Sequence, residues 1–417
     1  MKVKSWLSSC ILAGGACACA AGLAQPRSQT KAVAVSSTAV TLPGAVEAAW
    51  QRALQASESA GLLARAQAEQ AAATAWWAAP PSLELNHRTG RWQGDSDERE
   101  TELGVSVPVW LPGQRQAREQ VARVELEAAE VDTAAARLRV AGQVREAAWA
   151  IAMQKAEGDS IRLRHRSLQS LAADVDRRLS AGELARTDAL AARAEVLAVE
   201  SLRAEASARL QAAEAQWTAL TGLEQVPDPG EHAAPPAASA VDNHPELISY
   251  MHRVELARKR LELAGKSKRS PPEVMAWYRN ETAGGPAPSS NSVGIGIRLP
   301  LSTDDRKLPL LAAAASEYDI AQAAAKAVRE RLVAELATAR ASLTAAEQQL
   351  GIEHSRTSML RERTRLVAAA FRAGETSLPE TLRIYAASTQ AEASLARQEV
   401  ALGLARSKNQ QALGLMP

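Results

Sequence analysis

Two stretches of alternating apolar residues decide the fold: LGVSVPVWL at 103–111 and VGIGIRLPL at 293–301. In each stretch every second residue is Leu, Val or Ile, which predicts a strand with one apolar face. A weaker strand pattern precedes each stretch, so the sequence predicts two β-hairpins, at 82–111 and 273–301. Their strands are about ten residues long, which is the length that a tilted strand needs to cross a lipid bilayer.

The sequence repeats its landmarks at an offset of 192 residues; Gly182, for example, matches Gly374. The chain therefore divides into a first repeat at 42–222 and a second repeat at 245–417. A Pro-rich linker at 223–244 joins them.

Each repeat is predicted to hold the same elements in the same order. A helix comes first and ends before a pair of prolines, the hairpin follows, and a long helix comes next. A Gly ends the long helix, and a shorter return helix completes the repeat. The predicted helices are 44–78, 114–180 and 185–221 in the first repeat, and 245–266, 306–372 and 378–413 in the second.

The composition favours long helices packed closely together. The 417 residues include 90 Ala and a single Phe, so the bulky side chains of a thick core are scarce. Ala is the best helix former, and its small side chain lets helix backbones approach. The helices also show coiled-coil spacing. In the first return helix the residues at this spacing are Leu190, Ala194, Leu197, Ser201, Ala204 and Ala208.

Several classes of protein are disfavoured. The 49 basic and 47 acidic residues give a formal net charge of +2, which argues against a nucleic-acid partner. No segment after the N-terminal apolar run approaches 18 apolar residues, so no transmembrane helix is predicted. Nucleophile sets, phosphate loops and metal-ligand clusters are missing from the sequence. We therefore expect no enzymatic activity, no catalytic residues, no metal site and no cofactor.

The N-terminus indicates secretion. A basic start followed by a charge-free run is typical of a signal peptide, at 1–24, with an N-terminal extension at 25–41. All three Cys lie inside the signal peptide, so the mature chain would have none. The second alternative is lipoprotein processing, which would leave Cys17 or Cys19 as an acylated first residue.

Four strands cannot close a barrel, and unpaired strand edges cannot face lipid. We therefore expect several chains to share one barrel. A dimer would give eight strands, and a trimer would give twelve and leave room for water. Aromatic side chains are expected at both membrane boundaries. The candidates are Trp76, Trp77, Trp92 and Trp110.

Helix, hairpin, long helix, Gly turn and return helix, duplicated behind a signal peptide, resemble the TolC family of outer-membrane efflux channels. The most specific marks are RRLSAGELARTDALAAR at 177–193 and FRAGETSLPETLRIYAA at 371–387. The resemblance implies a fold that is mainly α with β. Four strands of each chain contribute to a shared 12-stranded outer-membrane β-barrel, and a long α-helical coiled-coil barrel continues it into the periplasm. It also implies a homotrimer in the outer membrane of a Gram-negative cell.

The resemblance assigns the two helix-turn-helix tips to the docking of a periplasmic membrane-fusion adaptor protein. Ser377 and Glu380 are spaced as a capping box at the second tip, whereas Ala185 leaves the first return helix without a side-chain cap. The residues that match the family's tip motif are Gly182, Leu184, Asp188, Leu190, Gly374, Ser377, Glu380 and Leu382.

In this family, acidic residues and ion pairs near the tips close the channel. This implies an entrance gate in which acids of the first long helix meet bases of the second. An ordinary solvated helix face is the alternative. The candidate gate residues are Asp174, Asp176, Arg361, Arg363 and Arg365.

The implied function is the exit duct of a tripartite efflux system, through which small solutes or metal cations leave passively. Its partners would be the adaptor, an inner-membrane transporter of the RND type and outer-membrane lipid, with no nucleic acid. RLPLSTDDRK at 298–307 resembles the heavy-metal cation efflux branch. The competing hypothesis is a periplasmic coiled-coil scaffolding protein without a pore.

Overall fold

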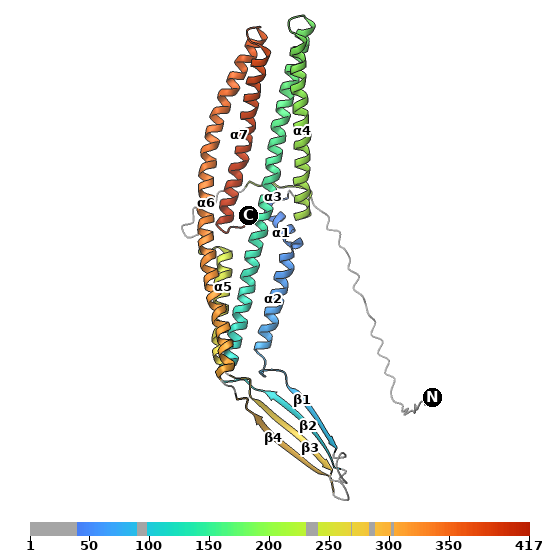
Figure 1. The fold of residues 1–417 in the computed structure, drawn as a ribbon, viewed down its shortest axis with the longest axis vertical. Helices are drawn as coiled ribbons and strands as arrows, with labels where there is room; N and C mark the ends of the chain where they lie inside the picture. Colours follow the sequence, from blue (N-terminus) through green and yellow to red (C-terminus); the bar gives the residue numbers. More distant parts are fainter. Residues whose placement is uncertain (1–39, 90–97, 231–240, 268, 283–287, 302–303) are drawn as a thin grey trace, which may run out of the picture. The chain divides into compact units, whose positions relative to one another are not determined.

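The structure is a computed structural model that describes residues 40–89, 98–230, 241–267, 269–282, 288–301 and 304–417. The predicted signal peptide, Cys17, Cys19, Trp92 and residues 231–240 of the linker lie outside this part. The elements, shown in Figure 1, are α1 (Leu42–Arg52), α2 (Leu54–Ala73), β1 (Ser82–Thr89), β2 (Arg99–Pro108), α3 (Gln114–Ser180), α4 (Arg186–Thr221), α5 (Pro245–Lys266), β3 (Glu273–Thr282), β4 (Ser290–Arg298), α6 (Asp304–Arg372) and α7 (Leu378–Ala412).

Two long helical hairpins, α3–α4 and α6–α7, make up most of the described residues (Figure 1). Each hairpin turns at a Gly in the left-handed conformation, Gly182 with φ 80° and Gly374 with φ 79°. An added Cβ would meet no atom within 4 Å at either Gly. The backbone angle, and not crowding, is therefore the reason for Gly at both turns.

Helix α3 joins the two halves of the chain, because it packs against α2 and α4 of its own half and against α5 and α7 of the other. Asp132 of α3 accepts hydrogen bonds from Ser249 and from Arg253 of α5, the latter at 3.1 Å. Arg145 of α3, only 2% exposed, donates to Gln411 of α7 at 2.5 Å. A buried guanidinium requires such partners, so these contacts fix α3 against both α5 and α7.

The largest apolar cluster lies where α1, α3 and α4 meet. Trp217 is fully buried there, and its indole Nε1 donates to the backbone oxygen of Gln225 at 3.2 Å. Apart from Trp50, Leu42 and Ile151, the remaining buried members are Ala and Val. The helices thus pack through small side chains around a few large ones.

The four strands form one antiparallel sheet in the order β1-β2-β3-β4. The central pair, β2 and β3, joins the hairpins of the two halves, with Leu103 opposite Tyr278. In the described part of the chain, β1 and β4 each pair with one strand only. The predicted fold class, mainly helical with four strands, is confirmed.

The prediction of one helix at 44–78 is wrong in its middle. Ala53 has extended backbone angles, φ −70° and ψ 137°, and separates α1 from α2. Neither Gly nor Pro stands at this point. The side chain of Arg52 instead lies against Gly222 at the end of α4, within 3.2 Å of the position of an added Cβ. The local sequence therefore carries no marker of this break.

The same prediction is wrong at its end, because α2 stops at Ala73. The backbone oxygens that follow are taken by side chains next to β2 and at the start of α3. Arg115 donates to the oxygen of Thr74 at 3.0 Å, and Trp110 donates to that of Ala75 at 3.1 Å. The segment after the helix can leave the helical path because its carbonyl groups are satisfied by these side chains, and the hydroxyl of Thr74 donates to the oxygen of Ala71 in the last turn.

Candidate functional site: the sheet faces and the helical tips

One face of the sheet is apolar across all four strands. The strand register places two complete apolar rows on it: Leu85, Leu103, Tyr278 and Val293, and Leu83, Val105, Ala276 and Ile295. Leu83, Leu85, Val293 and Ile295 are between 69% and 78% exposed in the single chain. Exposed apolar area of this extent on a sheet requires an apolar neighbour, which can be lipid or protein.

The opposite face of the sheet is polar and carries charge. At its centre the guanidinium of Arg279 contacts the carboxylates of Glu100 at 3.0 Å, Glu102 at 2.9 Å and Glu281 at 3.3 Å. Nearer the helices, Glu273 pairs with Arg298 at 3.1 Å. The sheet thus concentrates its Leu, Val and Ile side chains on one face and its paired Arg and Glu side chains on the other, which is typical of a barrel wall between lipid and water.

Three of the four predicted aromatic residues, Trp76, Trp77 and Trp110, lie where the sheet meets the helices, and Trp92 lies outside the described residues. Trp76 is 83% exposed and Trp77 is 47% exposed, and the indole of Trp110 is anchored to the oxygen of Ala75. Sequence reasoning missed Trp277 on the polar face. Its ring lies over Gly294 and Gly296, where an added Cβ would come within 2.4 and 2.8 Å of it. Its signal in the sequence is the VGIGI pattern, because Gly at alternate positions leaves room for a large cross-strand side chain.

At the tips, one apolar cluster combines all four long helices. Val175 of α3, Ala189 of α4, Phe371 of α6 and Leu378 of α7 are buried in it. Of the predicted tip residues, Leu184 and Leu382 pack against this cluster, whereas Leu190 remains 56% exposed. Within one chain, two of the leucines thus have a packing role and the third is available to a partner.

The predicted capping box at the second tip is wrong. Ser377 occupies the N-cap position of α7, but its side chain makes no capping hydrogen bond. Glu380 is held by Arg383, which donates to its two carboxylate oxygens at 2.9 and 2.7 Å. This side-chain hydrogen bond lowers the pKa of Glu380. A bidentate pair with Arg outcompetes the bond to a single backbone N–H.

The first tip shows the reverse arrangement. Ala185 has no side-chain acceptor, yet its backbone N–H donates to the carboxylate of Asp188 at 3.3 Å. A capping box has two hydrogen bonds, and Asp188 accepts the one that does not need an N-cap side chain. Its negative charge is also favourable in the first turn of a helix.

The predicted gate residues do not pair with one another in the described chain. Asp174 contacts Arg177 and Asp176 contacts Arg193, each at 3.0 Å within the first helical hairpin. In the second hairpin, Arg361 contacts Glu392 at 2.8 Å, Arg363 lies 3.8 Å from Glu380, and Arg365 is exposed. Four of the five predicted gate residues thus pair within their own hairpin, and a meeting of these charges between chains stays a prediction.

Sequence reasoning missed Arg178, which links the two tips. Its guanidinium donates to the backbone oxygens of Phe371 at 2.9 Å and Arg372 at 2.8 Å, and it lies 4.8 Å from the centre of the Phe371 ring. These oxygens end α6, where a cation is favoured. We call these contacts the Arg178 clamp. Phe371 is the single Phe of the sequence, so the composition alone could have marked it as a candidate packing residue at this tip.

The coiled-coil seam predicted for the first return helix faces outward. Leu190, Leu197 and Ala204 are exposed, whereas α4 packs on α3 through Ala192 and Val199. The helix therefore has two faces fit for close packing, of which a single chain covers one.

Two properties of the described residues bear on the site. None of their helices is long and apolar enough to cross a membrane. Among them, no group of three or more His, Cys, Asp or Glu side chains is placed to hold a metal ion.

Known structures share this fold. The outer membrane protein VceC from Vibrio cholerae superimposes with a TM-score of 0.73 over 89% of this chain and 96% of its own, at 18% identity. CusC, described in connection with transmembrane channel formation, gives 0.75 over 89% and 92%, at 16% identity. The open state of the MtrE outer membrane channel from Neisseria gonorrhoeae gives 0.73 over 90% and 89%, at 14% identity.

The chain therefore has the fold of these outer-membrane proteins along nearly its whole described length. The resemblance to the TolC family predicted from the sequence is confirmed at the level of fold. No family model matches the sequence, and no curated protein matches it.

Proposed function

We propose that this protein is a TolC-family outer-membrane channel and the exit duct of a tripartite efflux system. The observation that carries the proposal is the sheet, with one exposed apolar face, one charged face and two outer strands that lack a second partner. In a chain with the fold of outer-membrane channels, such a sheet is suited to form part of a barrel wall.

The chain assembles as a homotrimer with a shared 12-stranded barrel. Strand β4 of one subunit pairs with β1 of the next, which satisfies both outer strands and turns Arg279 and its glutamates toward a water-filled interior. The exposed Leu197 and Ala204 of α4 support the same assembly, because they lie at coiled-coil spacing on a face that a neighbouring helix can cover.

The helical tips dock a periplasmic adaptor, and an inner-membrane transporter of the RND type supplies the energy. Leu190 supports the docking proposal, since it is exposed beside an otherwise well-packed tip. Gly182 sets the turn that precedes Leu190, and Gly374 sets the equivalent turn of the second tip. The duct is passive, without enzymatic activity, and its cargo is small solutes or metal cations. Asp174, Asp176 and their basic counterparts serve as the entrance gate between subunits.

The test is to fractionate cells and to measure conductance. We expect a heat-modifiable trimer in the outer-membrane fraction, after removal of residues 1–24, and discrete single-channel currents in planar bilayers. A soluble periplasmic monomer without currents would contradict the proposal and favour the scaffolding alternative. Charge reversal of both Asp174 and Asp176 should raise the leak current, and an unchanged current would remove the gate from the proposal.

A further inference from the structure

A cavity of about 660 Å³ lies where the sheet meets the helices. Its walls come from three of the connections between strands and helices and from the adjoining ends of α5 and α6, so residues far apart in sequence converge on it. We call it the junction pocket and define it by its lining residues, which are Leu111, Pro112, Gly265, Lys266, Arg269, Pro300, Leu301 and Lys307.

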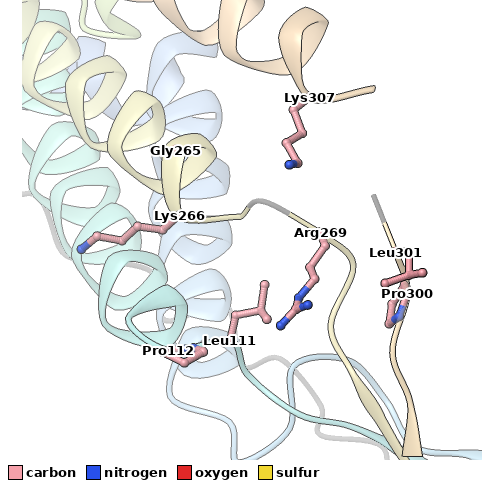
Figure 2. A pocket seen from close by; sticks show the side chains of 8 residues that line it. All are labelled: Leu111, Pro112, Gly265, Lys266, Arg269, Pro300, Leu301 and Lys307. Atoms are coloured by element: carbon pink, nitrogen blue, oxygen red, sulfur yellow. The ribbon is translucent and has the colours of Figure 1, made fainter. Parts of the chain in front are cut away.

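Among the residues that the structure describes, every charged side chain that lines the junction pocket is basic. Figure 2 shows Arg269 directed toward Leu111 and Lys307 directed toward the same space, whereas Lys266 points away from both. The stem of Lys266 passes within 3.8 Å of the position of a Cβ on Gly113. Among the described residues, no carboxylate lies within ion-pair distance of Arg269. Lys307 has a further interaction within the chain, so the inference rests first on Arg269.

The remaining walls are apolar and continue the apolar face of the sheet. Val293, Ile295 and Ile297 alternate along β4, and Leu299 and Leu301 continue the same alternation to the pocket. Leu301 is 93% exposed and Leu299 is 56% exposed, while Leu111 is buried at the base. A basic group at the end of an exposed apolar track fits a ligand with an anionic head and a hydrocarbon tail.

We propose that the junction pocket binds a phosphate group, held by Arg269 and Lys307, and that its source is a phospholipid whose acyl chain lies along Leu301 and Leu299. Guanidinium groups suit phosphate because they present paired N–H donors. The lipid source rests on the proposed function, which places a membrane against the apolar face of the sheet. The site would fix the height at which the membrane surface meets the channel.

The test measures binding to the purified full-length protein in detergent by native mass spectrometry, with dihexanoyl phosphatidylglycerol and inorganic phosphate as separate probes. Arg269→Gln should weaken binding of the lipid about tenfold, as loss of one charge-assisted hydrogen-bonding group predicts. Arg269→Lys should retain part of the lipid binding, because the positive charge is kept. Arg65→Gln, at an exposed position of α2 outside the pocket, is the matched control and should bind as the wild type does.

The two probes distinguish the sources. Binding of the lipid well above that of phosphate supports the phospholipid, and equal binding of both, each reduced in Arg269→Gln, supports a site for free phosphate. Binding that is absent in the wild type, or unchanged in Arg269→Gln, overturns the proposal. Conductance in bilayers is recorded separately, so a channel without this site and a protein that is no channel give different results.

Discussion

Arg178 shows how a single side chain can hold the two helical hairpins together at their tips. Its guanidinium satisfies two carbonyl groups at the end of α6 and covers Phe371, which is 3% exposed. The 192-residue repeat places Ala370 at the matching position of the second half, so the clamp has no symmetric counterpart. The C-terminal end of α6, in the second half, is therefore stabilised by a side chain of the first half.

Arg178→Gln should loosen the end of α6. Loss of hydrogen bonds from a charged donor to two carbonyl groups predicts a local destabilisation of about 1–3 kcal/mol. Amide hydrogen exchange at residues 371–375 should become faster by about one to two orders of magnitude. Arg177→Gln is the control, because that side chain is 77% exposed and, among the described residues, its ion pair is with Asp174 of its own helix. Unchanged exchange in Arg178→Gln would show that the clamp is not needed.

His244 makes the start of α5 sensitive to pH. It is 4% exposed, and its Nδ1 accepts a hydrogen bond from the N–H of Glu246 at 3.2 Å. Burial lowers its pKa, against a smaller opposite effect from Glu246. The folded state therefore binds fewer protons than the unfolded state below pH of about 6.5, the ordinary value for His.

The contribution of His244 to stability should thus be complete above pH of about 6.5 and be lost as the pH falls through the lowered folded pKa. We expect His244→Asn, which keeps a capping oxygen but cannot titrate, to flatten this part of the stability profile. Urea unfolding midpoints between pH 5 and 8 measure the effect. An identical pH dependence in both proteins would exclude His244 as its source.

At the scale of elements, α3 and α7 approach closely because Gly403 leaves room for Trp149. A Cβ on Gly403 would lie 2.0 Å from that indole ring, whereas Gly351 on α6 has no such neighbour. Gly403→Ala should lower stability by about 1–2 kcal/mol, since overpacking outweighs the gain in helix propensity. Gly351→Ala should raise it by about 0.5–1 kcal/mol. Thermal unfolding measures both, and a higher melting temperature in both variants would contradict the packing argument.

Elements marked by local chemistry were predictable from the sequence, and those set by distant contacts were not. The alternating residues at 293–297 predict a strand from local sequence alone, and Gly374 likewise predicts a helix end. The break at Ala53 has no Gly or Pro to mark it, and Arg52 beside it packs against the end of α4, which lies far along the chain. The predicted capping box of Ser377 and Glu380 is also wrong because of a contact that the motif does not include. Arg383, three residues further along, binds the carboxylate oxygens of Glu380.

The candidate functional site likewise contains parts that the local sequence predicts and parts that it does not. The apolar face of the sheet could be predicted, since alternation alone assigns each residue to a face. The Arg178 clamp and the junction pocket could not, because each needs residues of both halves or of separate connections. The pairing of β2 with β3 likewise joins residues more than 150 positions apart, such as Leu103 and Tyr278.

For the whole molecule, the decisive question is which medium each face of the sheet meets. Val293 and Ser292 are neighbours on β4 at the same depth, and they point to opposite faces. Both are exposed in the single chain, so neither substitution disturbs internal packing. A difference between Lys variants at these two positions therefore reports on the surroundings of the assembled sheet.

Val293→Lys should oppose insertion, because a lysine in the lipid-facing wall of a barrel costs about 2–4 kcal/mol near the middle of the bilayer. Ser292→Lys should insert normally and change only the ion selectivity of the pore, since its side chain meets water. Outer-membrane yield of heat-modifiable trimer measures insertion, and reversal potential measures selectivity. If both variants insert equally well, the apolar face does not meet lipid, and a protein partner must cover it instead.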